Sequence, residues 1–227
     1  MKHPMNRIVC AALAAAALTA GLSACVPLVV GGAVVGGGMM AADRRTTGAQ
    51  VEDEGIELRS ANRIAELLGD RGHINVTSYN RKVLLTGEVR TAEDRQKVEQ
   101  AVAAVQNVQG VVNDLGVMPA SSLGDRSNDT LITGKVRASF VDAQDLFASA
   151  YKVVTERGVV YLMGRVTQRE ATRASEIARS ITGVSKVVRV FDILTEEELR
   201  RATTANANAS SAPVTSMDSP AAAPMAR

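Results

Sequence analysis

The amino-acid sequence predicts an α+β fold made of two tandem copies of one small unit. In the middle of the 227-residue chain, residues 83–89 (VLLTGEV) recur as residues 160–166 (VYLMGRV). Around both segments, the apolar residues follow first a helical and then an alternating spacing, in the order helix, strand, strand, helix, strand. We therefore expect each unit to form a three-stranded mixed sheet covered by two helices.

Each unit is expected to open with an amphipathic helix, over about 56–69 in the first unit and about 129–141 in the second. Asn128 and Asp129 are residue types that favour the start of a helix, and we expect them to cap the second of these helices. The residues expected to face the core lie at helical spacing: Ile56, Ile64, Leu67 and Leu68, then Ile132, Val136 and Phe140.

A hairpin is expected next in each unit. Its strands cover about 74–79 and 83–88 in the first unit, and about 150–155 and 159–164 in the second. Residues 156–158 (ERG) form the second turn. Gly87 and Gly164 occupy matching places, where glycine would allow a bulge or a close approach of another backbone segment.

A second helix and a closing strand complete each unit. Thr91 with Asp94, and Thr167 with Glu170, have the spacing of a helix-capping box. The closing strands are expected over 108–117 and 184–194. The apolar stripes of the second helices are Val98, Ala101, Val102 and Val105 in one copy, and Ala174, Ile177, Ala178 and Ile181 in the other.

The N-terminus has the order of a secretory signal peptide. Residues 1–7 are basic, residues 8–21 are apolar, and the small-residue sequence LSAC ends at Cys25. LSAC resembles the bacterial lipobox, which implies cleavage after residue 24 and acylation of Cys25. Val26 follows the cysteine where inner-membrane retention favours Asp, so the outer membrane, facing the periplasm, is the expected location. An uncleaved transmembrane helix is the alternative, which the glycines of residues 31–38 disfavour.

Composition sets the remaining boundaries. We expect a signal peptide over 1–24, a lipidated tether over 25–54, the first unit over 55–118, a linker over 119–127 and the second unit over 128–195. Residues 196–227 are expected to form a disordered tail, because residues 202–227 consist mainly of Ala, Thr, Ser, Asn and Pro.

Several function classes find no support in the sequence. Cys10 and Cys25 are the only cysteines and His3 and His73 the only histidines, so no disulfide and no metal site is expected beyond the signal peptide. His73 is read as a surface residue rather than a catalyst. We find no phosphate-binding loop, no catalytic motif and no cofactor signature, and we predict neither an enzyme nor a nucleic-acid binder.

Charge distinguishes the two units. Residues 55–118 hold eight Lys/Arg and eight Asp/Glu, whereas residues 128–194 hold ten Lys/Arg and seven Asp/Glu. The basic excess of the second unit suits an anionic membrane surface. A second basic set, formed by Arg165, Arg169, Arg173 and Arg179, is interpreted as a solvated helix face.

Residues 153–164 (VVTERGVVYLMG) and 182–188 (TGVSKVV) resemble the BON domain, and the whole order resembles that of the dual BON-domain outer-membrane lipoproteins. That resemblance implies binding of anionic phospholipid through the second unit, in support of envelope integrity and without catalysis. The implied lipid-contacting residues are Leu131, Gly134, Lys135 and Arg137. The alternative interpretation is that they are ordinary solvent-exposed residues of the helix. A protein that this chain resembles carries a Trp at the position of Leu131, and leucine supplies apolar surface without the polar edge of that ring. The alternative function is an adaptor that docks on envelope proteins such as the outer-membrane barrel assembly machinery.

Overall fold

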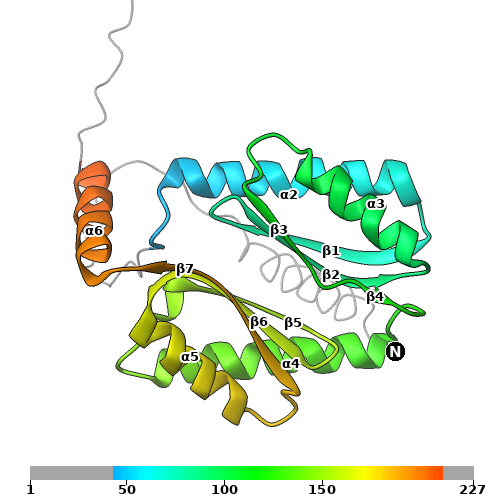
Figure 1. Cartoon of the computed structure of the whole chain (residues 1–227). Helices are drawn as coiled ribbons and strands as arrows, with labels where there is room; N and C mark the ends of the chain where they lie inside the picture. The colour runs from blue at the N-terminus through cyan, green and yellow to red at the C-terminus, as the bar shows by residue number, and fades with distance from the viewer. Residues whose placement is uncertain (1–42, 212–227) are drawn as a thin grey trace, which may run out of the picture. The chain divides into compact units, whose positions relative to one another are not determined.

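The computed structural model describes residues 43–211. These residues belong to one compact unit, and the apolar clusters of the fold all lie within it. Two α+β units follow each other along this part of the chain, as predicted (Figure 1). The expected signal peptide, Cys25 and most of the expected tether lie outside the described residues.

The first unit has the predicted order of elements. It contains α2 (Thr47–Leu68), β1 (Gly72–Tyr79), β2 (Lys82–Val89), α3 (Ala92–Ala103), β3 (Gly110–Asn113) and β4 (Gly116–Val117). Strand β1 is antiparallel to β2, and β3 and β4 are both parallel to it. The closing strand is split in two because the Asn113 side chain accepts a hydrogen bond from the Leu115 backbone and interrupts the ladder.

The second unit repeats this arrangement with longer strands. It contains α4 (Leu123–Asp142), a short 3₁₀ turn (Ala148–Ala150), β5 (Tyr151–Glu156), β6 (Val159–Thr167), α5 (Gln168–Ser180) and β7 (Lys186–Leu194). Strand β5 is antiparallel to β6, and β7 is parallel to β6. In both units the two helices cover the same face of the sheet (Figure 1).

The two hairpin turns and the two matching glycines have clear steric reasons. Asn80 and Arg81 in one turn, and Arg157 and Gly158 in the other, all have positive φ, as two-residue hairpin loops of type I′ require. At Gly87 an added Cβ would lie 2.0 Å from the His73 carbonyl oxygen. The predicted close backbone approach is therefore confirmed there. At Gly164 the corresponding distance to a carbonyl oxygen is 2.5 Å.

The expected helix starts were wrong. Helix α2 begins at Thr47, inside the expected tether, because Thr46 caps it. Helix α4 begins at Leu123, inside the expected linker, because Ser122 and Asp125 form a complete capping box. Asn128 and Asp129 therefore lie within the helix and do not cap it. Each start was predicted near the first apolar residue of the buried stripe, whereas the capping residue that sets the start lies further upstream.

Two further expectations need correction. Helix α6 (Glu196–Ser211) occupies the start of the expected disordered tail. Its first turn is stabilised because Thr195 and Glu198 exchange hydrogen bonds and because acidic residues suit a helix N-terminus. Leu67 was expected in the core but is 41% exposed, because Leu68, one position further round the helix, is the residue that faces the sheet.

Each unit has its own apolar core, and a third apolar cluster joins them. The cores lie between the helices and the sheet of each unit and use the predicted stripes, including Ile56, Val98, Ile132 and Ala174. The third cluster combines residues that face away from those helices. It contains Tyr79 and Leu84 of the first sheet with Tyr161, Met163 and Val190 of the second. The helix-free faces of the two sheets thus pack against each other.

Candidate functional site

The residues implied in lipid contact all lie on the exposed side of helix α4. Leu131, Gly134, Lys135 and Arg137 are exposed, and Leu131 is 64% exposed. The opposite side of the helix, with Ile132, Val136 and Phe140, is buried against the second sheet. The expected amphipathic helix is confirmed.

The exposed side of α4 has an apolar strip. Leu123, Leu131 and Val141 are large exposed apolar side chains, and Ala138 is exposed between them. Around Gly134 an added Cβ would meet nothing within 4 Å, so the surface there is open. An exposed apolar strip on a helix is typical of a surface that meets a membrane or another protein.

Two cations flank this strip. Among the described residues Lys135 takes part in no ion pair, and Arg137 makes only a 3.5 Å contact with the Val153 carbonyl oxygen. Asp142, at the last position of the helix, is the nearest exposed acid along it. Both cationic side chains are therefore available to an external anion.

A buried carboxylate fixes α4 against the second hairpin. Asp129 is buried and accepts hydrogen bonds from the backbone N–H groups of Arg157 (2.7 Å) and Gly158 (2.8 Å). These N–H groups belong to a two-residue turn and have no partner in the strand ladder. The residue expected to cap the helix thus holds the helix to the turn, so the exposed strip is presented by a firmly positioned element.

The contact between the two units also contains a cluster of polar side chains around Glu88 and Arg157. Glu88 of β2 is 1% exposed and receives the Arg157 guanidinium at 3.0 Å. Burial alone would raise the pKa of Glu88, but the Ser121 backbone N–H and Arg157 outweigh it and hold that pKa below its ordinary value. Arg157 also donates hydrogen bonds to the Gly87 and Asp114 carbonyl oxygens. One side chain of the second unit is therefore bonded to three residues of the first.

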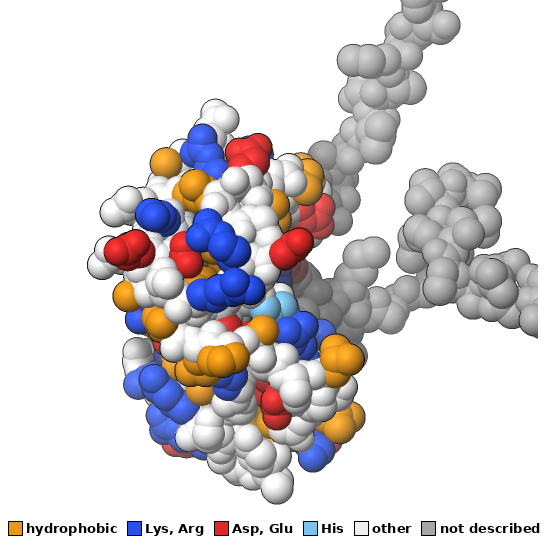
Figure 2. Space-filling view, turned by 90° about the vertical axis from the view of Figure 1, so that its right-hand side faces the viewer, with side chains coloured by type: hydrophobic (Ala, Val, Ile, Leu, Met, Phe, Trp, Pro, Cys, Tyr) orange, Lys and Arg blue, Asp and Glu red, His pale blue; other side chains and the backbone are white. Residues whose placement is uncertain are grey.

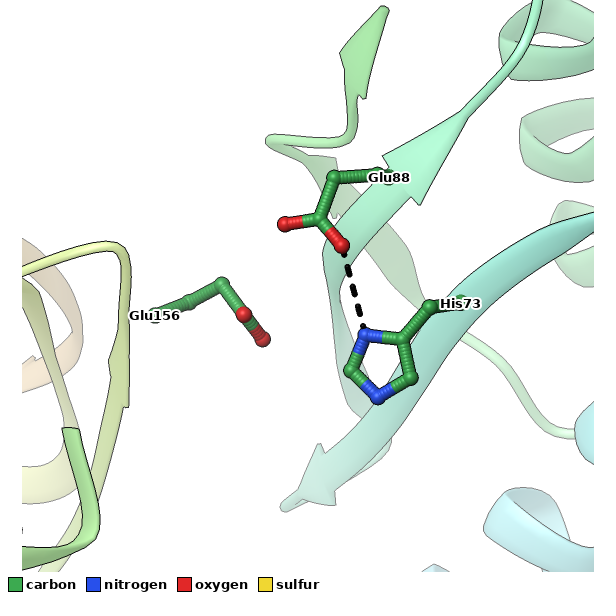
Figure 3. Close-up of side chains that lie close together, drawn as sticks. All are labelled: His73, Glu88 and Glu156. Carbon is green, nitrogen blue, oxygen red and sulfur yellow. Dashed lines mark ion pairs between the residues drawn. The ribbon is translucent and has the colours of Figure 1, made fainter. Parts of the chain in front are cut away.

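His73 was interpreted from the sequence as a surface residue without partners, but the structure places it beside two carboxylates. Its Nδ1 is 3.4 Å from a Glu88 carboxylate oxygen, and Glu156 of the second unit points toward the same place (Figure 3). One donor atom from each of these three residues lies within 4.8 Å of the other two. No sequence spacing signals this cluster, because its members come from β1, β2 and β5.

The opening beside His73 is basic. Figure 2 shows this histidine in pale blue with Lys and Arg side chains close by. A pocket of about 500 Å³ lies there, and its lining includes His73, Glu88, Arg71, Arg90 and Arg126. Glu88 and His73 both line this pocket, and Arg126 of α4 contributes to its lining.

The segment that precedes α2 contacts both units. Arg44 forms a bidentate ion pair with Glu170 of the second unit at 2.7 and 2.8 Å, and Arg45 pairs with Asp53 of the first at 2.7 Å. Burial opposes the charge of Arg44, but the hydrogen bond and the negative charge of Glu170 raise the pKa of Arg44 above its ordinary value. The chain therefore enters the fold at a fixed place.

The second basic set is divided by the structure. Arg169, Arg173 and Arg179 are exposed on α5, and Arg173 pairs with Asp145 at 3.0 Å. Arg165 instead donates to the Arg44 carbonyl oxygen at 3.3 Å. The interpretation as a solvated face therefore holds for the α5 residues but not for Arg165.

Comparison with known proteins identifies this arrangement. The family model of the BON domain matches residues 52–119 and 128–195, which together make up more than half of the chain. The chain belongs to the BON-domain family. The BON resemblance predicted from the sequence, and the tandem arrangement of two BON units, are thereby confirmed.

Individual known proteins are similar to the chain over half of its length or more. The chain is 38% identical over 176 residues to the outer membrane lipoprotein DolP of Haemophilus influenzae, covering 76% of this chain and 90% of that protein. It is 32% identical over 152 residues to a 21 kDa hemolysin of Actinobacillus pleuropneumoniae, covering 66% and 78%. It is 31% identical over 118 residues to the osmotically-inducible protein Y of Escherichia coli, covering 50% and 58%. The chain is thus a DolP-like protein with two BON units.

Proposed function

We propose that this protein is a non-catalytic outer-membrane lipoprotein whose second BON unit contacts anionic phospholipid through the exposed side of α4. The observation that carries the proposal is the apolar strip around Leu131, flanked by the available cations Lys135 and Arg137. Membrane-surface helices combine these two features, an apolar face and cations beside it. Support of envelope integrity, which the family resemblance implies, is part of the same proposal.

The lipid anchor belongs to the same proposal. The similarity to DolP supports an outer-membrane lipoprotein, and Cys25 of the lipobox is the residue that would carry the acyl chains. Among the described residues, no helix is both long and apolar enough to cross a bilayer. Two or three acyl chains give stable anchoring, which a single chain does not.

The magnitude of the α4 contact explains why an anchor is needed. Inserting the exposed part of Leu131 contributes about 1–2 kcal/mol, and each of Lys135 and Arg137 near an anionic surface contributes about 1 kcal/mol. Together these correspond to a dissociation constant on the order of a millimolar or weaker. A tether supplies an effective concentration of about that size, so the anchored protein would engage the surface although the free unit binds weakly.

The test is NMR titration of the chain from residue 40 onward, which lacks the anchor. With bicelles containing phosphatidylglycerol, amide shifts should concentrate in α4, and added salt should reduce them because ions screen surface charge. Leu131→Gln and Lys135→Gln should each weaken binding several-fold. The matched controls are Leu58→Gln on α2, since Leu58 is also 64% exposed, and Lys97→Gln on α3.

Three results would contradict the proposal. Equal shifts with purely zwitterionic bicelles would remove its electrostatic part. Shifts spread evenly over both units would rule out α4 as the site. Equal loss of binding in Leu58→Gln and Leu131→Gln would also rule out α4, because the two leucines lie in different units but are equally exposed.

A second candidate function is protein docking through the first unit. Val51 and Leu58 are exposed apolar residues separated by two helical turns, so they lie on one side of α2. This pair is a candidate contact for an envelope protein such as the barrel assembly machinery. Crosslinking in intact envelopes tests it: Leu58→Gln should lose its crosslinked partners while lipid binding is retained.

A further inference from the structure

The strongest unexplained feature is the cluster of His73, Glu88 and Glu156. The three side chains converge from different strands onto one place (Figure 3), with one donor atom of each within 4.8 Å of the others. The 3.4 Å between His73 Nδ1 and Glu88 is longer than an ordinary hydrogen bond, and Nδ1 is buried with no hydrogen-bond partner. Burying such an atom without a partner is unfavourable.

Glu156 makes the cluster short of positive charge. Its carboxylate is buried, at 3% exposure, and accepts a hydrogen bond from the neutral Asn75 amide at 2.9 Å. Among the ion pairs of residues 43–211, none involves Glu156, whereas Glu88 already has Arg157. A buried carboxylate without a cation is costly, since its desolvation is not offset by an opposite charge.

The geometry suits a small metal ion rather than a further hydrogen bond. Zinc binds histidine nitrogen and carboxylate oxygen at about 2.0–2.2 Å, so tetrahedral ligands lie roughly 3.3–3.6 Å apart. The His73–Glu88 separation of 3.4 Å already has this value. The donor atom of Glu156 lies within 4.8 Å of the other two, so a small side-chain rotation would complete the set of three ligands.

Neighbouring groups would orient the ligands. The Glu88 oxygen that does not face His73 receives Arg157, and the backbone N–H of Ser121 donates to the other at 3.2 Å. Asn75 holds Glu156. Metal-binding carboxylates in proteins are usually held by such outer hydrogen bonds. Two of the three ligands, His73 and Glu88, line the pocket described above, whereas Glu156 lines a separate surface pocket together with Asn75.

We propose that His73, Glu88 and Glu156 bind one divalent transition-metal ion, which joins the two BON units. A nitrogen donor with two carboxylates favours zinc, iron or manganese over calcium or magnesium, which prefer oxygen ligands alone. Two ligands come from the first unit and one from the second, so the ion acts as a cross-link. Three arginines and one acid, Asp70, line the pocket beside the ligands, and this excess of positive charge reduces the affinity for a cation.

The experiment uses the chain from residue 40 onward, in which the described residues belong to one compact unit. It contains no cysteine, and His73 is its only histidine, so competing zinc ligands are few. Chelator-treated protein is titrated with ZnCl₂ by calorimetry and heated with and without the ion. We expect one zinc per chain and, near one hundred times the dissociation constant, a rise in Tm of about 5–10 °C.

Two variants separate a metal site from a purely structural cluster. Glu156→Gln keeps an acceptor for Asn75 but removes the buried charge, so it should raise the Tm without zinc and lower zinc affinity at least about tenfold. His73→Gln should lower zinc affinity similarly. Glu66→Gln, an exposed residue of α2, is the matched control and should leave both measurements unchanged.

The outcomes decide the proposal without reference to lipid binding. The proposal is supported if Glu156→Gln has a higher Tm than the unsubstituted chain without zinc but a smaller rise in Tm when zinc is added. Absence of zinc binding by the unsubstituted chain would overturn it, as would zinc binding that survives both His73→Gln and Glu156→Gln.

Discussion

The ion pair between Arg44 and Glu170 joins the segment that precedes α2 to the second BON unit, and its contribution to stability can be measured directly. The two side chains are 8% and 4% exposed, and two hydrogen bonds of 2.7 and 2.8 Å join them. Glu170 also accepts the Thr167 N–H as part of the α5 capping box. Glu170→Gln retains an acceptor for the cap but removes the charge that Arg44 faces, so it isolates the ion pair.

The expected loss of stability is large for one substitution. Removing one partner of a buried ion pair costs about 3–5 kcal/mol, because the remaining charge stays buried without compensation. Since the glutamine keeps the cap, we expect the lower end, about 3 kcal/mol. For a domain of this size, that corresponds to a fall in Tm of about 6–12 °C.

Urea unfolding of the chain from residue 40 onward, followed by circular dichroism at neutral pH, measures this effect. The control is Glu176→Gln, an exposed residue of the same helix, which should change the free energy of unfolding by less than about 0.5 kcal/mol. If Glu170→Gln behaves like this control, Arg44 is not held by Glu170 and the reasoning is wrong.

The pH dependence supplies a second check on the same pair. Burial alone would raise the pKa of Glu170, but the Arg44 hydrogen bond and the Thr167 N–H outweigh it and hold the pKa below its ordinary value of 4.5. A group with a lowered pKa in the folded state stabilises the fold above its unfolded pKa, and that contribution is lost as pH falls through the folded pKa. The stability difference between the unsubstituted chain and Glu170→Gln should therefore be constant above about pH 5 and narrow below about pH 4.5.

Three further substitutions should be measured by the same unfolding assay. Gly87→Ala should cost at least about 3 kcal/mol, because φ is +107° and the new Cβ would meet the His73 carbonyl; a neutral result would refute the steric argument. Gly134→Ala should raise stability by up to about 1 kcal/mol, since the site is open and alanine favours a helix; a loss would reveal an unseen contact. Asp129→Asn should cost about 1–3 kcal/mol, because one N–H of the β5–β6 turn loses its acceptor; no change would mean that α4 is held otherwise.

Local patterns predicted the two units well because they report local physics. The hairpins, the Thr91 and Thr167 caps and the core positions of Ile132, Val136 and Phe140 depend on residues a few positions apart. The same approach failed at helix starts, because it followed the apolar stripe to its end and passed over the capping residues further upstream. Leu67 and Leu68 differ by about 100° around the helix, so apolarity alone did not distinguish which one faces the sheet.

Of the two candidate sites, one was predicted through the family resemblance and the other was missed. The resemblance implied Leu131, Gly134, Lys135 and Arg137, and these residues share the exposed side of one helix. His73 was interpreted without its partners, because Glu88 lies across a hairpin and Glu156 in the other unit. The pairing of His73 with Glu88 could have been predicted, because the position of the turn fixes which residues of the two strands lie opposite each other.

The sequence by itself determined two α+β units, their order of elements and the amphipathic faces that build each core, because these depend on spacing along the chain. Only the tertiary structure decided that the helix-free sheet faces pack together, and that contact brings Glu156 to His73 and Arg157 to Glu88. Arg44 reaches Glu170 in the same way, across most of the described chain. Such pairs are chosen by the packing of whole surfaces, and no local pattern encodes them.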